Sequence, residues 1–112
     1  MLPTSLDWHR AFVRQPDSVQ LMVLDTRDTP VGTVPDIELI VDGLHVGAHA
    51  GDRGQYVWVL LCPLDTDGPR GPMARIPMWD PDTANAAQPQ LRPVADIIDD
   101  IVAEARRMAA AR

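Results

Sequence analysis

The sequence predicts an α+β domain in which an antiparallel sheet is followed by a helix that packs on it. Three observations predict this class: a helical apolar pattern at each end of the chain, short β-type runs joined by turn residues in the middle, and a proline-rich stretch before the last helix. At 112 residues, 46% of them apolar, the chain can bury a core of its own. We therefore expect one domain over residues 1–112: an N-terminal helix, a mostly antiparallel meander of four or five strands, a proline-rich loop or arm over 63–93, and a C-terminal helix on the sheet.

The first helix is expected over about residues 5–15. Thr4 or Ser5 can cap its start, and Pro16 stops it because proline cannot donate the next helical hydrogen bond. Apolar side chains recur at helical spacing, so one face should be buried. That face would carry Leu6, Trp8, Phe12 and Val13.

A strand is expected over 18–25, where apolar residues alternate with other types. The alternation places Val19, Leu21 and Val23 on one face. Residues 26–35, which contain two prolines and a glycine, are expected to form a loop.

Residues 36–49 predict a β-hairpin, because Asp42-Gly43 is a favoured pair for a two-residue type I′ turn. That turn fixes the strand register and hence the face of every side chain. The predicted core-facing pairs are Val41–Leu44, Leu39–Val46 and Ile37–Ala48. The pairs on the opposite face are Ile40–His45, Glu38–Gly47 and Asp36–His49.

The next strand is expected to continue the meander after a four-residue turn at 51–54. The resulting core-facing pairs are Ala48–Val57, Val46–Val59 and Leu44–Leu61. On the opposite face the pairs are His49–Tyr56, Gly47–Trp58 and His45–Leu60.

The stretch 63–93 holds seven of the eleven prolines, which leaves room for one short edge strand around Arg75–Trp79. A C-terminal helix then follows from Pro93, which suits a first turn. Its apolar stripe is Val94, Ile97, Ile98, Ile101, Ala105 and Met108.

Two histidines, His45 and His49, raise the question of a metal site. On a strand they share a face but lie about 13 Å apart, whereas zinc takes ligand nitrogens at about 2 Å. We therefore expect no metal site here. A catalytic thiolate at Cys62 would need a nearby base or helix N-terminus, and the predicted register places His45 near Leu60, so a Cys62–His45 pair stays open; a free cysteine is more commonly a small buried residue. The sequence contains no glycine-rich phosphate loop and no CxxC motif. We expect no cofactor and no catalytic residue.

The second face of the sheet is too apolar to be an ordinary solvated face. Either one helix covers each face, or the C-terminal helix covers one face and the other is a contact surface. The proline-rich arm likewise either folds over its own sheet or contacts another chain. The candidate contact residues on this face and the arm are Ile40, His45, His49, Tyr56, Trp58, Leu60, Met73, Ile76, Met78 and Trp79.

Composition narrows the class of partner. The net charge of −6, with ten scattered arginines and no lysine, disfavours nucleic acid and is typical of a high-GC bacterium or one of its phages. No apolar run is long enough to span a membrane, and the start of the sequence lacks a secretory pattern. A lone cysteine fits a reducing compartment. We therefore expect a cytoplasmic protein, or one assembled into a particle that forms in the cytoplasm.

These observations predict a non-enzymatic small structural or protein-interaction subunit of a larger assembly, with a protein partner or self-association. Two alternatives stay open. One is a small-molecule-binding domain or cofactor-free enzyme using the face of His45, Tyr56 and Trp58. The other is a monomeric inhibitor of a host protein.

Overall fold

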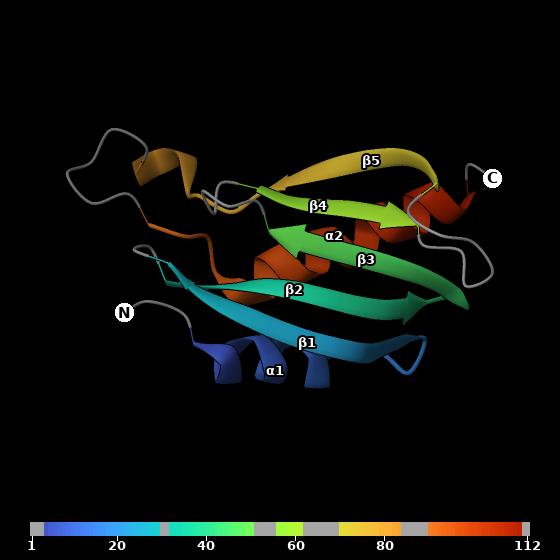
Figure 1. The fold of residues 1–112 in the computed structure, drawn as a ribbon, viewed down its shortest axis with the longest axis horizontal. Helices are drawn as coiled ribbons and strands as arrows, with labels where there is room; N and C mark the ends of the chain where they lie inside the picture. Colours follow the sequence, from blue (N-terminus) through green and yellow to red (C-terminus); the bar gives the residue numbers. More distant parts are fainter. Residues whose placement is uncertain (1–3, 30–31, 51–55, 62–69, 84–89, 111–112) are drawn as a thin grey trace.

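The computed structural model describes residues 4–29, 32–50, 56–61, 70–83 and 90–110. The sheet has the order β1-β2-β3-β4-β5 with every neighbouring pair antiparallel, so the predicted α+β meander is confirmed (Figure 1). In chain order the elements are α1 (Ser5–Val13), β1 (Val19–Thr29), β2 (Gly32–Val41), β3 (Leu44–Ala50), β4 (Tyr56–Leu61), β5 (Arg70–Pro77), a short 3₁₀ helix η1 (Pro81–Thr83) and α2 (Val94–Ala110).

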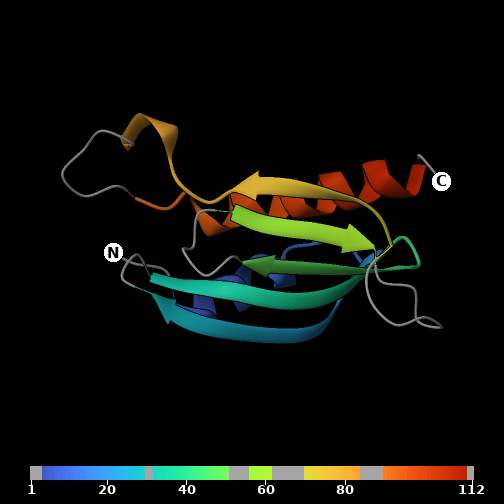
Figure 2. The same cartoon turned by 45° about the horizontal axis from the view of Figure 1, so that its top comes forward.

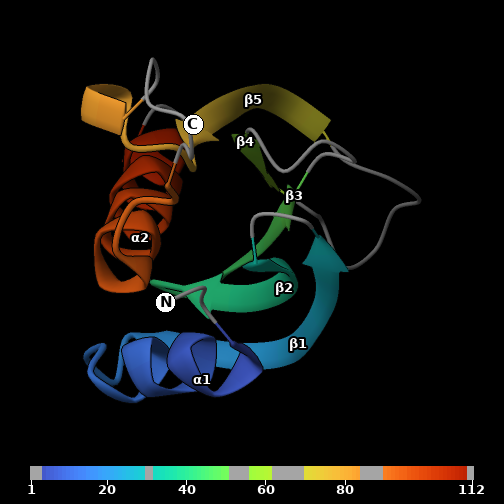
Figure 3. The same ribbon diagram turned by 90° about the vertical axis from the view of Figure 1, so that its left-hand side faces the viewer.

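Both helices lie on the same face of the sheet, which we call the inner face. α1 packs against β1 and β2, and α2 packs against β2 to β5 and against α1. Figures 2 and 3 show the sheet curving towards the helices, so the opposite, outer face is convex. The hypothesis that one helix covers each face is therefore wrong, and among the described residues no helix covers the outer face.

The core lies between the inner face and the two helices, and α2 supplies its largest helical contribution. The predicted stripe of α2 is confirmed, with Val102 added and with Val94 only partly buried. The buried residues of α2 are Ile97, Ile98, Ile101, Val102, Ala105 and Met108. They pack against strand residues that include Ile37, Leu39, Val46, Ala48, Val57 and Val59.

α1 begins one turn before Trp8 and buries a narrower face than the sequence predicts. The Asp7 carboxylate accepts hydrogen bonds from the backbone N–H of Thr4 at 2.8 Å and from its hydroxyl at 3.2 Å, which fixes the first turn. Trp8 and Phe12 are buried together with Ala11. Leu6 and Val13, predicted to lie beside them, are 54% and 83% exposed.

These two predictions fail because of helix geometry. A helix advances about 100° per residue, so a face centred on Trp8, Ala11 and Phe12 turns Leu6 and Val13 towards solvent.

The segment predicted as a loop over 26–35 is instead largely strand. β1 runs to Thr29 and β2 starts at Gly32, which makes a second hairpin. A β-bulge interrupts their pairing between Leu21 and Val23. Because one extra residue shifts every later side chain to the other face, Leu24 packs against the core and Val23 does not. The prediction that Val23 shares a face with Val19 and Leu21 is therefore wrong.

The predicted β2–β3 hairpin is confirmed in its turn and in all six pairs. Asp42 and Gly43 have φ of 50° and 82°, the positive values that a type I′ turn needs at both central positions. A side chain of α2 also stabilises the turn: the Arg106 guanidinium donates hydrogen bonds to the Asp42 carboxylate at 3.1 Å and to the Ser18 hydroxyl at 3.0 Å.

The predicted β3–β4 register is wrong by two residues. Val59 pairs with Ala48, Trp58 with His49 and Leu60 with Gly47. Since side chains alternate with a period of two, this shift changes the partners but keeps every residue on its predicted face. The predicted turn at 51–54 lies outside the described residues.

The proline-rich stretch contains an edge strand that is longer and earlier than predicted. β5 spans Arg70–Pro77 and pairs with β4. After it the chain doubles back, because Trp79 forms a bridge with Leu91 and the N–H of Arg92 donates to the carbonyl of Met78 at 2.6 Å. This part of the stretch therefore folds onto its own domain.

We expect Trp8→Ala to lower the free energy of unfolding by about 3–5 kcal/mol, because Trp8 is fully buried in the core and its removal leaves a cavity. Val13→Ala on the same helix should change it by less than about 0.5 kcal/mol, since Val13 is exposed. Urea unfolding of both variants checks this. Equal losses would contradict the assigned faces of α1.

Gly43→Ala should lower the free energy of unfolding by about 1–2 kcal/mol, because φ of 82° is costly for a residue with a Cβ. An added Cβ meets nothing within 4 Å, so the cost belongs to the backbone alone. Gly43→Asn should cost clearly less, since asparagine adopts positive φ more readily. Thermal unfolding measures both variants, and an equal cost for Ala and Asn would argue against the type I′ turn.

Candidate functional site

The candidate site is a row of side chains that crosses the outer face. The registers place one residue from each strand in this row, since Asp25 pairs with Asp36, Asp36 with His49, His49 with Trp58, and Trp58 with Arg75. Neighbouring strands lie about 4.8 Å apart, so the row spans roughly 19 Å. We call Asp25, Asp36, His49, Trp58 and Arg75 the cross-strand band.

Most side chains of the band are exposed on the outer face. Trp58 is 36% exposed, and the side chain of His49 is 44% exposed. Arg75 and Asp25 are exposed as well, and Asp36 is partly buried. Val23, which the bulge turns outwards near Asp25 on β1, is 42% exposed and adds one apolar side chain at the β1 end of this face.

The part of the outer face nearer the β2–β3 turn is much less accessible. Leu60 is 8% exposed, and the His45 side chain is 13% exposed. Within the described part of the chain neither ring nitrogen of His45 has a hydrogen-bond partner, and its Nε2 lies 3.9 Å from Oε1 of Glu38. These two predicted contact residues are therefore not freely exposed.

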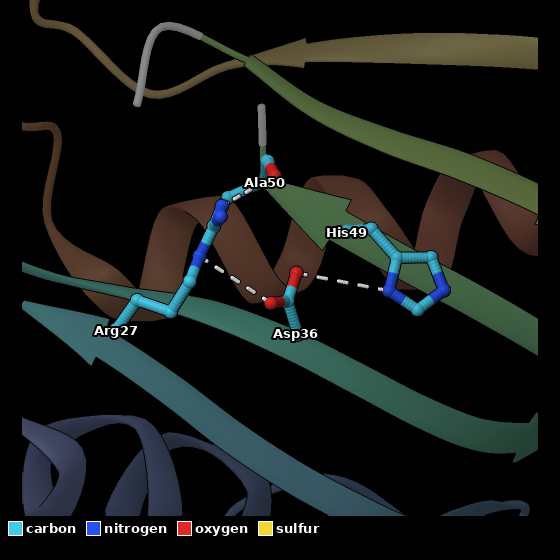
Figure 4. A network of polar contacts seen from close by, with 4 residues as sticks. All are labelled: Arg27, Asp36, His49 and Ala50. Carbon is cyan, nitrogen blue, oxygen red and sulfur yellow. Dashed lines mark hydrogen bonds and ion pairs between the residues drawn. The ribbon is translucent and has the colours of Figure 1, made fainter. Parts of the chain in front are cut away.

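A polar network holds the acidic part of the band in place (Figure 4). The Asp36 carboxylate faces Nε of Arg27 at 3.4 Å through one oxygen and Nδ1 of His49 at 3.7 Å through the other. Arg27 also donates from Nη2 to the carbonyl of Ala50 at 2.8 Å. Three strands are thus tied together by one carboxylate and one guanidinium, which orients His49 next to Trp58.

The other half of the band is aromatic and cationic. Trp58 on β4 has His49 as its cross-strand neighbour on β3 and Arg75 on β5. The guanidinium carbon of Arg75 lies 4.7 Å from the ring centroid of Tyr56, a cation–π distance. This contact steers the long Arg75 side chain along β4 and leaves the indole of Trp58 partly open to solvent.

The predicted contact residues of the arm differ in how deeply they are buried. Ile76 and Met78 are 6% and 0% exposed and belong to the core, so they offer no surface to another chain. Trp79 is half-buried in the bridge to Leu91. Met73 lies on β5, but its side chain is outside the described residues, and Ile40 is half-buried beside His45.

Sequence reasoning placed Asp36 opposite His49 on this face, but it missed Asp25, Arg27, Val23 and Arg75 as members of this surface. Arg75 could have been found, because it alternates with the apolar Ile76 on a strand that the sequence placed at the edge of the sheet. Val23 could not, because the bulge that exposes it leaves no local sequence signal.

The band combines an aromatic surface with charged side chains of both signs. No group of three or more His, Cys, Asp or Glu side chains in the described ranges could hold a metal ion, and Cys62 lies outside them.

Away from the band, on α2, the hydrogen bond and the charge of Glu104 raise the pKa of Arg107 above its ordinary value.

Comparisons with protein-family models, curated proteins and solved structures gave no match. Among the helices of the described residues, none is both long and apolar enough to cross a membrane.

The Arg27–Asp36 pair should show a coupling of about 0.5–1 kcal/mol in a double-mutant cycle of Arg27→Gln and Asp36→Asn, because both side chains are partly exposed. The coupling should shrink in high salt, which screens exposed charges. Urea unfolding of the four proteins provides the cycle. Arg14→Gln combined with Asp36→Asn is the control, and its two effects should add. Zero coupling for Arg27 and Asp36 at low salt would show that the network does not stabilise the sheet.

Proposed function

We propose that this chain is a non-enzymatic protein-interaction subunit that binds a partner chain through the cross-strand band. The observation that carries the proposal is the position of Trp58: it is 36% exposed, and it stands on β4, beside the edge strand β5, on the face that neither helix covers. Exposed tryptophan beside arginine is typical of residues that contribute most to binding at protein interfaces.

The strand pairing and polar contacts beneath the band support the same function. The band's residues stand on paired strands, and the contacts of Arg27, Asp36 and His49 fix part of it before a partner arrives. A partner would therefore lose little entropy in ordering this surface, which favours affinity. The convex outer face calls for a partner that is either concave or an extended segment that lies across the strands.

The composition supports a cytoplasmic setting and a protein as the partner. The net charge of −6 disfavours binding to the phosphate backbone of nucleic acids, and the arginines are scattered along the sequence rather than clustered. We propose that the chain acts in a high-GC bacterium or a phage of such a host, as one component of a larger assembly.

Light scattering of the purified chain over a concentration series tests the proposal first. A multimer that Trp58→Ala converts to monomer would support self-association through the band. Trp58→Ala should cost roughly 1 kcal/mol of stability, because the indole is partly solvated and loses mainly cross-strand contacts. The variant should therefore remain folded in circular dichroism.

If the chain is monomeric at every concentration, the second test is capture of a partner from a lysate of a high-GC actinobacterium. The matched control is Arg107→Gln on α2, far from the band. A protein retained by the wild type and by the control but lost with Trp58→Ala would support a heterologous partner, as an inhibitor or an assembly subunit would have. If neither experiment gives any association that depends on Trp58, the proposed function is wrong.

A further inference from the structure

We infer that the partner presents an acidic, apolar segment to the band, with an apolar side chain on Trp58 and a carboxylate at Arg75. This inference rests on the proposed function and specifies the chemistry of the partner. It follows from which charges of the band are already paired within the chain and which are not.

Arg75 is a cation set up to receive a carboxylate. Its guanidinium lies 4.7 Å from the Tyr56 ring centroid, and a guanidinium that stacks on a ring keeps its in-plane N–H donors available. Within the described ranges no carboxylate pairs with Arg75. By contrast, Arg27, Arg92 and Arg106 each face a carboxylate of this chain at 2.6 to 3.4 Å.

A cationic group of the partner would find a weaker site on the band, at Asp36. The Asp36 carboxylate lies between Arg27 and His49, with one oxygen directed to each, so a cationic partner would have to compete with the Arg27 guanidinium. Trp58 stands directly between His49 and Arg75, which places a nitrogen-bearing side chain on each side of the apolar contact.

The band also has a polarity that orients the segment. Asp25, at the far end of the row on β1, is four strand spacings from Arg75, or roughly 19 Å measured along the curved sheet. An acidic residue of the partner is attracted at the β5 end and repelled at the β1 end. The segment should therefore carry its carboxylates at one end and cross the strands rather than run along them.

An array of random 12-residue peptides probed with the labelled full-length chain tests this inference. We expect the bound peptides to combine Asp or Glu with a large apolar residue, and matched peptides with Asn or Gln in place of the acids to bind about tenfold more weakly. Arg75→Gln should cause a similar loss for the acidic peptides. Arg75→Lys should restore only part of it, because lysine keeps the charge and loses the planar, stacked fork.

The control is Arg14→Gln, which removes an exposed arginine from the end of α1 and should leave peptide binding unchanged. Because Arg75 is exposed, its variants should fold normally, and their melting temperatures verify this. Peptides that bind through Trp58 but are basic or uncharged, or that ignore Arg75→Gln, would overturn this inference and leave the proposed function standing. Binding that Trp58→Ala does not weaken would count against both. If no peptide of the array binds, the inference about an acidic segment is overturned. The proposed function is still tested by capture of a folded partner from the lysate.

Discussion

The burial of the apolar stripe of α2 against the inner face of the sheet is the interaction on which the rest of the structure depends. Six buried side chains of this helix, from Ile97 to Met108, close the core over four of the five strands. An antiparallel sheet of this size needs such a cover on one face to be stable. α1 completes the same layer through Trp8 and Phe12. Because both described helices pack on the inner face, neither of them covers the cross-strand band on the outer face.

The bulge in β1 shows how a single residue can change the surface. Without it, Val23 would continue the inward alternation of Val19 and Leu21. With it, Leu24 takes the inward position and Val23 joins Asp25 on the outer face. A bulge on an edge strand also makes unwanted strand pairing harder, since it breaks the regular ladder that another chain would need. The same feature therefore shapes the edge and extends the candidate interface.

The band itself is a product of register. Trp58 would lie opposite Gly47 in the register predicted from the sequence, with open space beside the indole. The observed shift of two residues places it next to His49, whose ring faces Asp36. An isolated aromatic on a sheet thereby becomes part of a row with an acidic end and a cationic end. That polarity is what gives the proposed partner a definite chemistry and a direction of approach.

Features that depend on short-range physics could be predicted from the amino-acid sequence alone. The Asp42-Gly43 turn fixes the β2–β3 register through its φ angles, and the 3.6-residue period of α2 selects its buried stripe. From the candidate site it predicted His49, Tyr56 and Trp58, because strand alternation places them on one face. Only the tertiary structure decided that both helices share a face, that β1 bulges, and that Arg75 reaches Tyr56. These depend on packing between residues far apart in the chain, where many arrangements satisfy the local pattern equally well and the best-filled core selects one.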